Sequence, residues 1–253
     1  MPDKRRHRGP HPKDADCFQA AEIPRLQQAT DDYCWLLSHG YPPKAALSLV
    51  GNRFSLRDRQ RRALQRCGAG DESCRRRRHR QVDISDLEGK PLAIDGYNAL
   101  LTVEAAFDSG VLLLARDGVL RDLASMSRHY RSVQRTRTAI EAIGEVLALA
   151  GTSGVTWFLD RPVSNSGRLR HLLLDTAADH GWPWQVELSE QTDRTLIHSP
   201  AIVASADSAI LDRCQSWFNL ARLVVAAAVH DAWIIDLSTP NRPPPAAGRQ
   251  SPP

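Results

Sequence analysis

The alternation of apolar, strand-like runs with helical patterns over residues 91–236 is the feature that most limits the folds open to this chain. Strands are expected at 91–95, 111–115, 155–160, 184–188, 201–204 and 232–236. Helical patterns lie between them, notably at Thr136 to Ala150, Gly167 to His180 and Ser208 to Cys214. Because strands that alternate with helices form largely parallel sheets, the pattern predicts an α/β layer fold with a mostly parallel sheet.

The first, third and fifth of these expected strands end at or just before an aspartate. Asp95 and Asp160 close the first and third, Asp207 follows the fifth, and Asp193 is expected near the end of another main strand. The carboxyl ends of parallel strands are where open α/β sheets place their sites. Carboxylates that meet there repel one another unless a cation neutralises them. Since Mg²⁺ and Mn²⁺ prefer oxygen ligands, Asp95, Asp160, Asp193 and Asp207 are the candidate ligands of a Mg²⁺ or Mn²⁺ ion.

Catalysis at such a site would be phosphodiester hydrolysis, since a bound metal polarises the phosphodiester and activates a water. Asp95, Asp160 and Asp207 are then catalytic candidates. Asn98 joins them because it lies on the turn after Asp95, close enough to orient that carboxylate or a water. An alternative remains open, in which Asp95 caps a helix and Asn98 is an ordinary turn residue.

Four further acids form a second group of candidates: Glu104, Asp117, Asp122 and Asp212. Glu104 falls two helical turns beyond the Asp95 motif, where it faces either the same site or solvent. Asp117 and the glycine after it are typical of a tight turn behind an apolar strand. Asp122 is next to Arg121 and could equally belong to a surface ion pair.

The loop after Asp160 is a candidate phosphate-binding segment. It is rich in hydroxyls and turn formers and leads into a helix, whose N-terminal backbone N–H groups suit an anion. Arg161 and Arg168 would supply charge, and Ser164 and Ser166 would supply hydroxyls. The glycine spacing and lysine of a P-loop are absent, and a structural loop with a serine cap is the alternative.

The remaining segments suggest a modular chain. Residues 1–16 read as a disordered basic tail, 17–67 as a small helical module, 68–90 as an Arg-rich linker and 237–253 as a Pro-rich disordered tail. The linker contains Arg75, Arg76, Arg77 and Arg78, which could contact RNA phosphates. A solvated spacer is the alternative interpretation of this run.

Composition limits the class of protein but not its function. The net charge of +4 suits a polyanionic partner, yet only four of the 33 basic residues are lysine, a bias that also reflects GC-rich coding. No apolar run approaches the roughly 20 residues that span a bilayer, and the first residues lack a signal-peptide core. A cytoplasmic protein without a membrane partner is therefore expected. Five cysteines, an odd number, favour reduced thiols.

Two motifs resemble those of known nucleases. Ile94-Asp95-Gly96-Tyr97-Asn98 and Val203-Ala204-Ser205-Ala206-Asp207-Ser208 look like the opening and closing acidic motifs of PIN-like and NYN-type nuclease domains. The resemblance implies a Rossmann-like, PIN-like three-layer domain over 91–236 that binds Mg²⁺ or Mn²⁺ and cleaves RNA. It matches Asp95 and Asp207 to metal ligands, Asn98 to their polar partner and Asp193 to an internal acid. The second acid that usually follows the closing motif at once is here delayed to Asp212.

A wider resemblance covers most of residues 25–236. The chain is similar to an uncharacterised prokaryotic family, numbered 434 among domains of unknown function, whose name implies no activity. The segments that carry this likeness are Leu36 to Tyr41, Leu49 to Leu56, Asp117 to Asp122 and Leu159 to Gly167.

Three functions are compatible with these patterns. The first is a metal-dependent ribonuclease in which the helical module and the arginine run hold the RNA backbone. The second is a non-catalytic RNA- or nucleotide-binding protein that uses the same crevice. The third is a structural adaptor, in which the acids are helix caps and turn residues. Divalent-metal binding separates the first from the third, and turnover separates it from the second.

Overall fold

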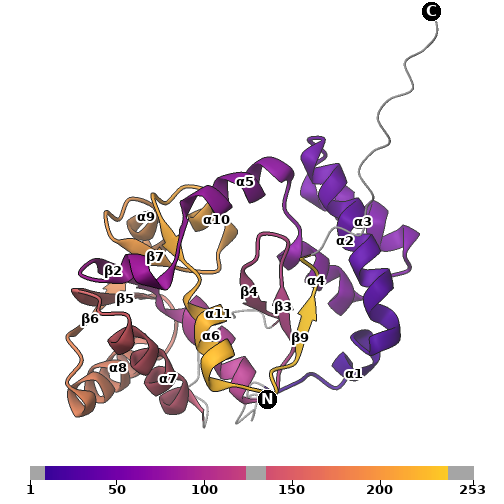
Figure 1. Ribbon diagram of the computed structural model, residues 1–253. Helices are drawn as coiled ribbons and strands as arrows, with labels where there is room; N and C mark the ends of the chain where they lie inside the picture. The colour runs from indigo at the N-terminus through magenta and orange to yellow at the C-terminus, as the bar shows by residue number, and fades with distance from the viewer. Residues whose placement is uncertain (1–8, 124–134, 239–253) are drawn as a thin grey trace, which may run out of the picture.

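The computed structural model describes residues 9–123 and 135–238, whose arrangement is shown in Figure 1. Its α-helices are α1 (Asp14–Cys17), α2 (Ile23–Ser38), α3 (Pro43–Arg53), α4 (Asp58–Cys67), α5 (Asp71–Arg80), α6 (Gly96–Phe107), α7 (Thr136–Leu149), α8 (Ser166–His180), α9 (Thr192–Ile197), α10 (Ser208–Leu211) and α11 (Leu220–Ala228). Its strands are β1 (Gln81–Val82), β2 (Pro91–Asp95), β3 (Leu112–Leu114), β4 (Leu120–Asp122), β5 (Gly154–Asp160), β6 (Trp184–Ser189), β7 (Ile202–Ala204), β8 (Trp217–Phe218) and β9 (Ile234–Asp236). Two 3₁₀ turns, η1 (Ala20–Glu22) and η2 (Ile84–Leu87), complete the elements.

A six-stranded sheet forms the centre of the α/β part. Its order is β1-β8-β7-β2-β5-β6, and every neighbouring pair is parallel. The prediction of a mixed α/β fold with a mostly parallel sheet is therefore confirmed. The four expected strands β2, β5, β6 and β7 occupy its middle and one side, whereas the two-residue strands β1 and β8 at the other side are too short to show a periodic pattern.

The side chains of this sheet alternate between two apolar layers. In β2, Leu92 and Ile94 belong to the core shared with α6, α7, α8 and α11, while Ala93 belongs to a second core beneath α9 and α10. In β7, Val203 likewise lies on the α9 and α10 side. Because successive strand residues point to opposite faces, a strand buried on both sides must be apolar throughout. Helices accordingly cover both faces of the sheet.

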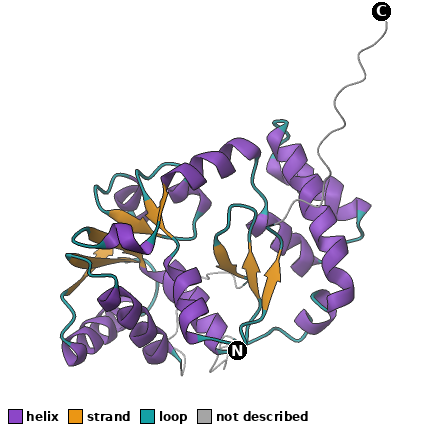
Figure 2. Ribbon diagram, in the orientation of Figure 1, coloured by secondary structure: helices purple, strands orange, loops and turns teal. Residues whose placement is uncertain are grey.

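Two of the expected strands are not part of the main sheet. The runs predicted at 111–115 and 232–236 form β3 and β9, which join β4 in a separate three-stranded sheet of order β4-β3-β9. Figure 2 shows this sheet between the main sheet and the N-terminal helices. A short apolar run predicts a strand but contains no information on its partner, because pairing depends on residues far away in the chain.

The N-terminal helices share their core with this second sheet. Leu26 and Tyr33 of α2 and Leu64 of α4 lie in one apolar cluster with Leu113 of β3 and Ile235 of β9. The helical pattern expected over 17–67 is present as α2, α3 and α4. The module does not have an independent core, however, because its apolar face is completed by β3 and β9, which lie outside residues 17–67.

The stretch expected as an Arg-rich linker, 68–90, is instead structured. It contains α5, η2 and β1, which pairs with β8 at the edge of the main sheet. Arginine is a good helix former, and α5 has Asp71 and Glu72 in its first turn and basic residues in its last, the polarity that the helix dipole favours. Glycines at 68 and 70 end α4 and start α5, so the break in pattern is one turn long and the arginine run is helical.

Parts of both expected tails are also ordered. Asp14 in α1 is buried and accepts hydrogen bonds from Nε and Nη2 of Arg59, the latter at 2.9 Å. Leu237 is buried in the cluster of the second sheet. Residues 1–8 and 239–253 of the two expected tails lie outside the described residues. No helix within the described ranges is long and apolar enough to cross a membrane. All five cysteines are buried, and none of them forms a disulfide.

Candidate active site at the carboxyl edge of the main sheet

Asp95 is the centre of the candidate site. It ends β2 and is only 4% exposed. One of its oxygens, Oδ2, accepts hydrogen bonds from Asn98 Nδ2 at 2.5 Å and from Ser205 Oγ at 2.7 Å. The other oxygen, Oδ1, accepts no hydrogen bond from any residue in the described ranges. The carboxylate is thus fixed in orientation on one side and available to a ligand on the other.

Gly96, the second residue of the Asp-Gly-Tyr-Asn motif, is required by a close approach. A Cβ at this position would lie 2.5 Å from Leu159 Cδ2 and 3.0 Å from the Phe158 carbonyl oxygen, both in β5. Only glycine lets α6 start this close to the neighbouring strand. The early start places Asn98 in the first turn of α6, within reach of Asp95.

Asp207 and Asp160 lie at the same edge of the sheet. β7 and β5 are the two neighbours of β2, and both are parallel to it, so the carboxyl ends of all three strands lie at the same edge of the sheet. After β2 the next strand of this sheet, β5, is added on one side of β2. After β7 the next strand, β8, is added in the opposite direction, so the gap between β2 and β7 is a topological switch point. In α/β sheets, ligands bind in this type of crevice.

Ser205 connects two of the acids. Its Oγ donates to Asp95 and accepts from the backbone N–H of Asp207 at 3.0 Å. Asp207 in turn caps α10, where its Oδ1 accepts from the Ala209 N–H at 2.6 Å and from the Ile210 N–H at 3.4 Å. The interpretation of an acid as a helix cap, considered for Asp95, therefore applies to Asp207, whose second oxygen Oδ2 accepts no hydrogen bond from the described residues.

Repulsion between carboxylates contributes to the raised pKa values of Asp95 and Asp193. The pKa of Asp95 is raised to about 7, mainly by burial and in addition by the charges of Asp207 and Asp160, which together outweigh the two hydrogen bonds that lower it. Burial also raises the pKa of Asp193, with contributions from Asp207 and Asp160, while Arg213 lowers it. Asp193 lies in the first turn of α9 rather than at the end of a strand. The four predicted acids are thus close enough to influence one another.

The fit to a metal ion is partial. Within residues 9–123 and 135–238, no group of three or more His, Cys, Asp or Glu side chains is placed so that it could hold a metal ion. Mg²⁺ usually keeps several waters and takes only one or two protein carboxylates, together with substrate phosphates. Asp95 Oδ1 and Asp207 Oδ2 are free oxygens of the kind such a cation requires. The residues present therefore fit a sparsely ligated Mg²⁺ or Mn²⁺ better than a fully protein-enclosed ion.

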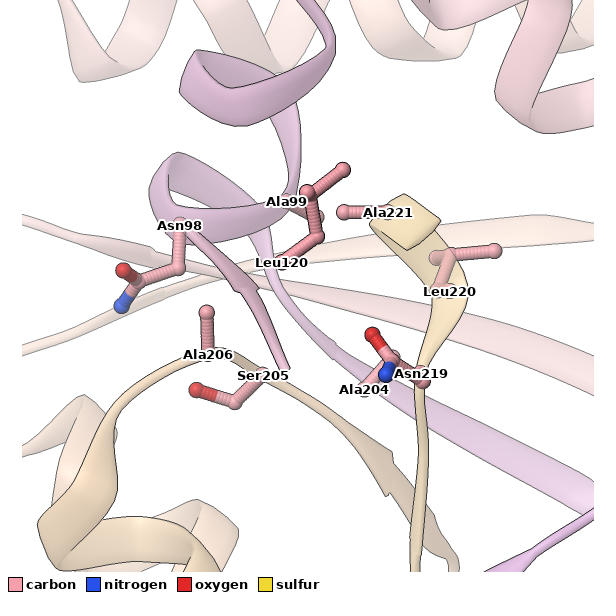
Figure 3. Close-up of a pocket in the computed structure, with 9 residues that line it drawn as sticks. All are labelled: Asn98, Ala99, Leu120, Ala204, Ser205, Ala206, Asn219, Leu220 and Ala221. Carbon is pink, nitrogen blue, oxygen red and sulfur yellow. The ribbon is translucent and has the colours of Figure 1, made fainter. Parts of the chain in front are cut away.

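A small pocket is lined by Asn98 and Ser205, the two residues that donate hydrogen bonds to Asp95 (Figure 3). It contains about 240 Å³ of space, its mouth included, and small apolar side chains make up most of its wall. Asn98 and Ser205 line it on one side, with the amide and the hydroxyl directed to the same side, and Asn219 lies at the other end. The pocket therefore has polar groups beside the carboxylate and an apolar floor.

Two of the secondary candidates are structural. Asp117 is buried and accepts hydrogen bonds from Arg121 Nη1 and Nη2, both at 2.8 Å, and from Arg77 Nη1 at 2.6 Å. Asp212 accepts from Arg77 Nε at 2.9 Å and Nη2 at 2.7 Å. Both carboxylates are saturated by guanidinium groups, so neither is available to a metal. Arg77 lies 40 and 135 positions from the two carboxylates, whereas Arg121 is only four positions from Asp117.

The other two secondary candidates are buried in the α6 neighbourhood. Glu104 is fully buried and accepts a hydrogen bond from Thr136 of α7, so it faces neither solvent nor the strand edge. Asp122 is buried in β4, and its Oδ2 lies 3.5 Å from Thr102 Oγ1. The Thr102 hydroxyl also donates to the Asn98 carbonyl at 3.0 Å, which links Asp122 to the candidate site by one turn of α6.

The loop after Asp160 is mainly a structural loop. Ser166, the first residue of α8, is buried and donates to the Arg161 carbonyl at 3.3 Å. Arg161 is exposed and lies 3.4 Å from Glu190. Only Ser164, half-buried, and Arg168, exposed, remain as predicted contacts for phosphate.

The arginines of α5 divide between its two faces. Arg77 is buried, which makes its predicted role as a phosphate contact wrong, and Arg76 lies 3.3 Å from Asp212. Arg75 and Arg78 are exposed and form no ion pair with any described residue. These two, three positions apart on one face of the helix, are the part of the run that can reach an anionic partner.

Two residues of the site were assigned no role from the sequence. Ser205 lies two positions before Asp207 and could have been recognised from the Ser-x-Asp pattern as a hydroxyl donor. Arg121 donates from Nε to the Ala206 carbonyl at 2.9 Å, and no local signal indicates this contact, because the two residues are 85 positions apart.

The pKa of Asp95 leads to a prediction about stability. A carboxyl with a pKa of about 7 in the folded state and about 4 in the unfolded state binds its proton more tightly when folded. Stability is therefore lost as the pH rises from about 4 to about 7, at about 1.4 kcal/mol for each pKa unit of the shift. Asp95→Asn keeps an acceptor for Asn98 and Ser205 without the charge. We expect this variant to gain thermal stability over the wild type between pH 5 and pH 8.

Thermal unfolding without divalent metal, followed by circular dichroism across this pH range, measures the gain. Asp175→Asn is the control, because Asp175 is exposed on α8. The difference in melting temperature between this variant and wild type should be the same at every pH in the range. An Asp95→Asn protein that is no more stable than wild type at pH 8 would contradict the assignment of a destabilised carboxylate.

Comparison with known proteins places the chain in a family. The model described as domain of unknown function (DUF5616) matches residues 84–223, and that described as protein of unknown function (DUF434) matches residues 25–80. An uncharacterised protein of Methanocaldococcus jannaschii is 26% identical over 186 residues, which are 74% of this chain and 88% of the relative. No solved structure matches. Because the first match covers more than half of the chain and includes β2, β5 and β7, the chain belongs to the DUF5616 family, with a DUF434 segment before it.

Proposed function

We propose that this protein is a Mg²⁺- or Mn²⁺-dependent ribonuclease whose α/β part is a PIN-like, Rossmann-like domain. The observation that carries the proposal is Asp95, a buried carboxyl at the carboxyl end of a central strand, with Asp207 and Asp160 close enough to oppose its ionisation. A protein that only needed a cap or a turn at this position would gain nothing from such a destabilised acid. A divalent cation would relieve the repulsion.

The residues divide into separate roles under this proposal. Asp95 Oδ1 and Asp207 Oδ2 would hold the metal, with Asp160 and Asp193 around its waters. When bound, the ion would polarise a phosphodiester and activate a water. Asn98 and Ser205 keep the Asp95 carboxylate in one orientation through its other oxygen. Since the metal needs the ionised carboxylate, its affinity should increase with pH up to about 7.

The test is incubation of the purified chain with a labelled RNA pool under Mn²⁺, Mg²⁺ or EDTA. Fragments that form with metal and disappear with EDTA are the expected result. RNA that is retained but not cleaved would replace the proposal with a non-catalytic RNA- or nucleotide-binding protein that uses the same crevice. Neither cleavage nor retention, together with no Mn²⁺ binding by electron paramagnetic resonance, would leave the acids as scaffolding of a structural adaptor.

RNA would be held by the exposed face of α5. Arg75 and Arg78 are the exposed cations of that helix without a carboxylate partner among the described residues, and α5 lies against α10, which begins one residue after Asp207. Contacts to phosphates position a nucleic acid without reading its sequence. We therefore expect RNA to bind with a strong dependence on salt.

The double variant Arg75→Gln/Arg78→Gln should weaken RNA binding at low salt. It should also reduce the slope of log K against log[salt] by about 1.4, since each single-strand phosphate contact contributes roughly 0.7. Fluorescence anisotropy at several salt concentrations measures this slope. Lys13→Gln/Lys44→Gln removes the same charge from exposed positions just before α1 and in α3 and should change the slope less. Equal slopes for the two double variants would contradict the α5 interface.

A further inference from the structure

The helix that follows Asp207 is too short to form alone. α10 has four residues, and isolated helices of this length do not persist in water. Its position, and that of Asp207 at its N-cap, must therefore be fixed from outside. Ile210 and Leu211 of α10 pack in one apolar cluster with Leu196 of α9, and arginines donate charged hydrogen bonds at both ends of the helix.

Arg121 of β4 holds the N-terminal end. Its Nε donates to the Ala206 carbonyl at 2.9 Å, and its Nη2 lies 3.3 Å from Ser208 Oγ. These two residues are the immediate neighbours of Asp207 in the chain. One guanidinium group thus contacts the backbone before the acid and the side chain after it.

Helix α5 holds the C-terminal end. Asp212, the C-cap of α10, receives two hydrogen bonds from Arg77, and its carbonyl oxygen accepts from Arg80 Nη1 at 2.6 Å. In Figure 1, α5 runs beside α10. A short helix fixed at both ends in this way cannot shift along its axis without breaking charged hydrogen bonds.

Asp117 joins two of the arginines that hold α10, Arg121 and Arg77. Its oxygens accept from Arg121 and from Arg77 at 2.6–2.8 Å, and its side chain is buried. The guanidinium group of Arg121 is therefore oriented by Asp117 while its Nε points to Ala206. Planar, rigid donor geometry of this type is specific to arginine, and a lysine cannot contact both groups at once.

We infer that Arg121 is a positioning residue, which sets the location of Asp207 at the edge of the main sheet. The inference rests on the proposed function for the catalytic consequence, since Asp207 is there a metal ligand. The structural consequence, a fixed loop from Ala206 to Ile210, does not depend on that proposal. Arg121 touches neither substrate nor metal in this scheme and acts through the backbone that carries Asp207.

Arg121→Lys separates positioning from folding. A lysine keeps a positive charge beside Asp117, and so keeps the buried ion pair, but gives up the contacts to Ala206 and Ser208. Arg121→Met removes the ion pair with Asp117 as well as the contacts to Ala206 and Ser208, and it is therefore the more severe variant. Arg116→Lys is the matched control, because Arg116 is on the same hairpin but contacts Ala69 and Asp71 instead of the loop before α10.

Hydrogen exchange of the amides from Asp207 to Ile210 is the first readout. We expect exchange there to be at least about tenfold faster in Arg121→Lys than in wild type, with unchanged exchange in α2 and α4, and no change in Arg116→Lys. The second readout is RNA cleavage, where Arg121→Lys should lower kcat by about tenfold or more with RNA affinity changed less than about twofold, because a small misplacement of a reacting group is costly.

The outcomes are distinguishable from failure of the proposed function. If the wild type cleaves no RNA, the ribonuclease proposal fails, and the exchange pattern alone decides the role of Arg121. Exchange at Asp207 to Ile210 that stays at the wild-type rate in Arg121→Lys overturns the inference. Exchange that rises equally throughout the chain also overturns it, since the arginine would then be a general stabiliser of the fold.

Discussion

Asp95→Asn and Asp207→Asn are each expected to abolish metal-dependent RNA cleavage. Each change removes an anionic ligand from the proposed metal site but preserves the shape of the side chain. Metal polarisation contributes several kcal/mol of transition-state stabilisation, and each 1.4 kcal/mol or so is a factor of ten, so kcat should fall by about 100-fold or more. Single-turnover cleavage of labelled RNA at saturating protein concentration measures this loss.

Both variants must be shown to fold. Asp95→Asn keeps an acceptor for Asn98 and Ser205, and Asp207→Asn keeps an acceptor for the N–H groups of α10. Asp175→Asn on the exposed face of α8 is the control and should retain full activity. Activity close to wild type in a folded Asp95→Asn or Asp207→Asn protein would rule out the metal site as proposed.

The largest effect on stability is expected from Asp117→Ala. The change removes the carboxylate that pairs with two buried guanidinium groups, those of Arg77 and Arg121. Breaking a buried pair leaves an uncompensated charge and typically costs about 3–5 kcal/mol. Urea unfolding followed by tryptophan fluorescence at pH 7 measures the free energy of unfolding. Asp71→Ala, which removes the exposed partner of Arg116, should cost less than about 1 kcal/mol.

The free energies of unfolding of wild type and Asp117→Ala should also differ in how they respond to acid. Burial by itself raises the pKa of Asp117, but Arg121 and Arg77 outweigh it and lower the pKa to about 2. Since the unfolded value is about 4, the stabilisation by this carboxylate is complete above pH 4 and is lost as the pH falls towards 2. The difference between wild type and Asp117→Ala should therefore shrink over that range. A difference that is constant from pH 5 to pH 2.5 would show that Asp117 is not the stabilising anion.

The sequence by itself determined the local elements and the position of the acids on them. β2, β5 and β7 were predictable because a strand buried on both faces is mostly apolar, and its end is marked where polar residues begin. The edge strand β6 was predictable from its alternation of buried and exposed residues. Asp95 and Asn98 were predictable as a pair since only three positions separate them. Parallel strands all end at one edge, so the convergence of Asp95, Asp160 and Asp207 followed from the fold class alone.

Only the tertiary structure decided which charges are used for folding and which remain available. The arginine run was visible in the sequence, but the burial of Arg77 depends on Asp117 and Asp212, which are 40 and 135 positions away. The partner of Asp95 across the crevice, Ser205, is 110 positions away. Periodicity reports the environment of a residue within its own helix or strand. The partners of a buried charge are set by the packing of distant elements, which no local pattern contains.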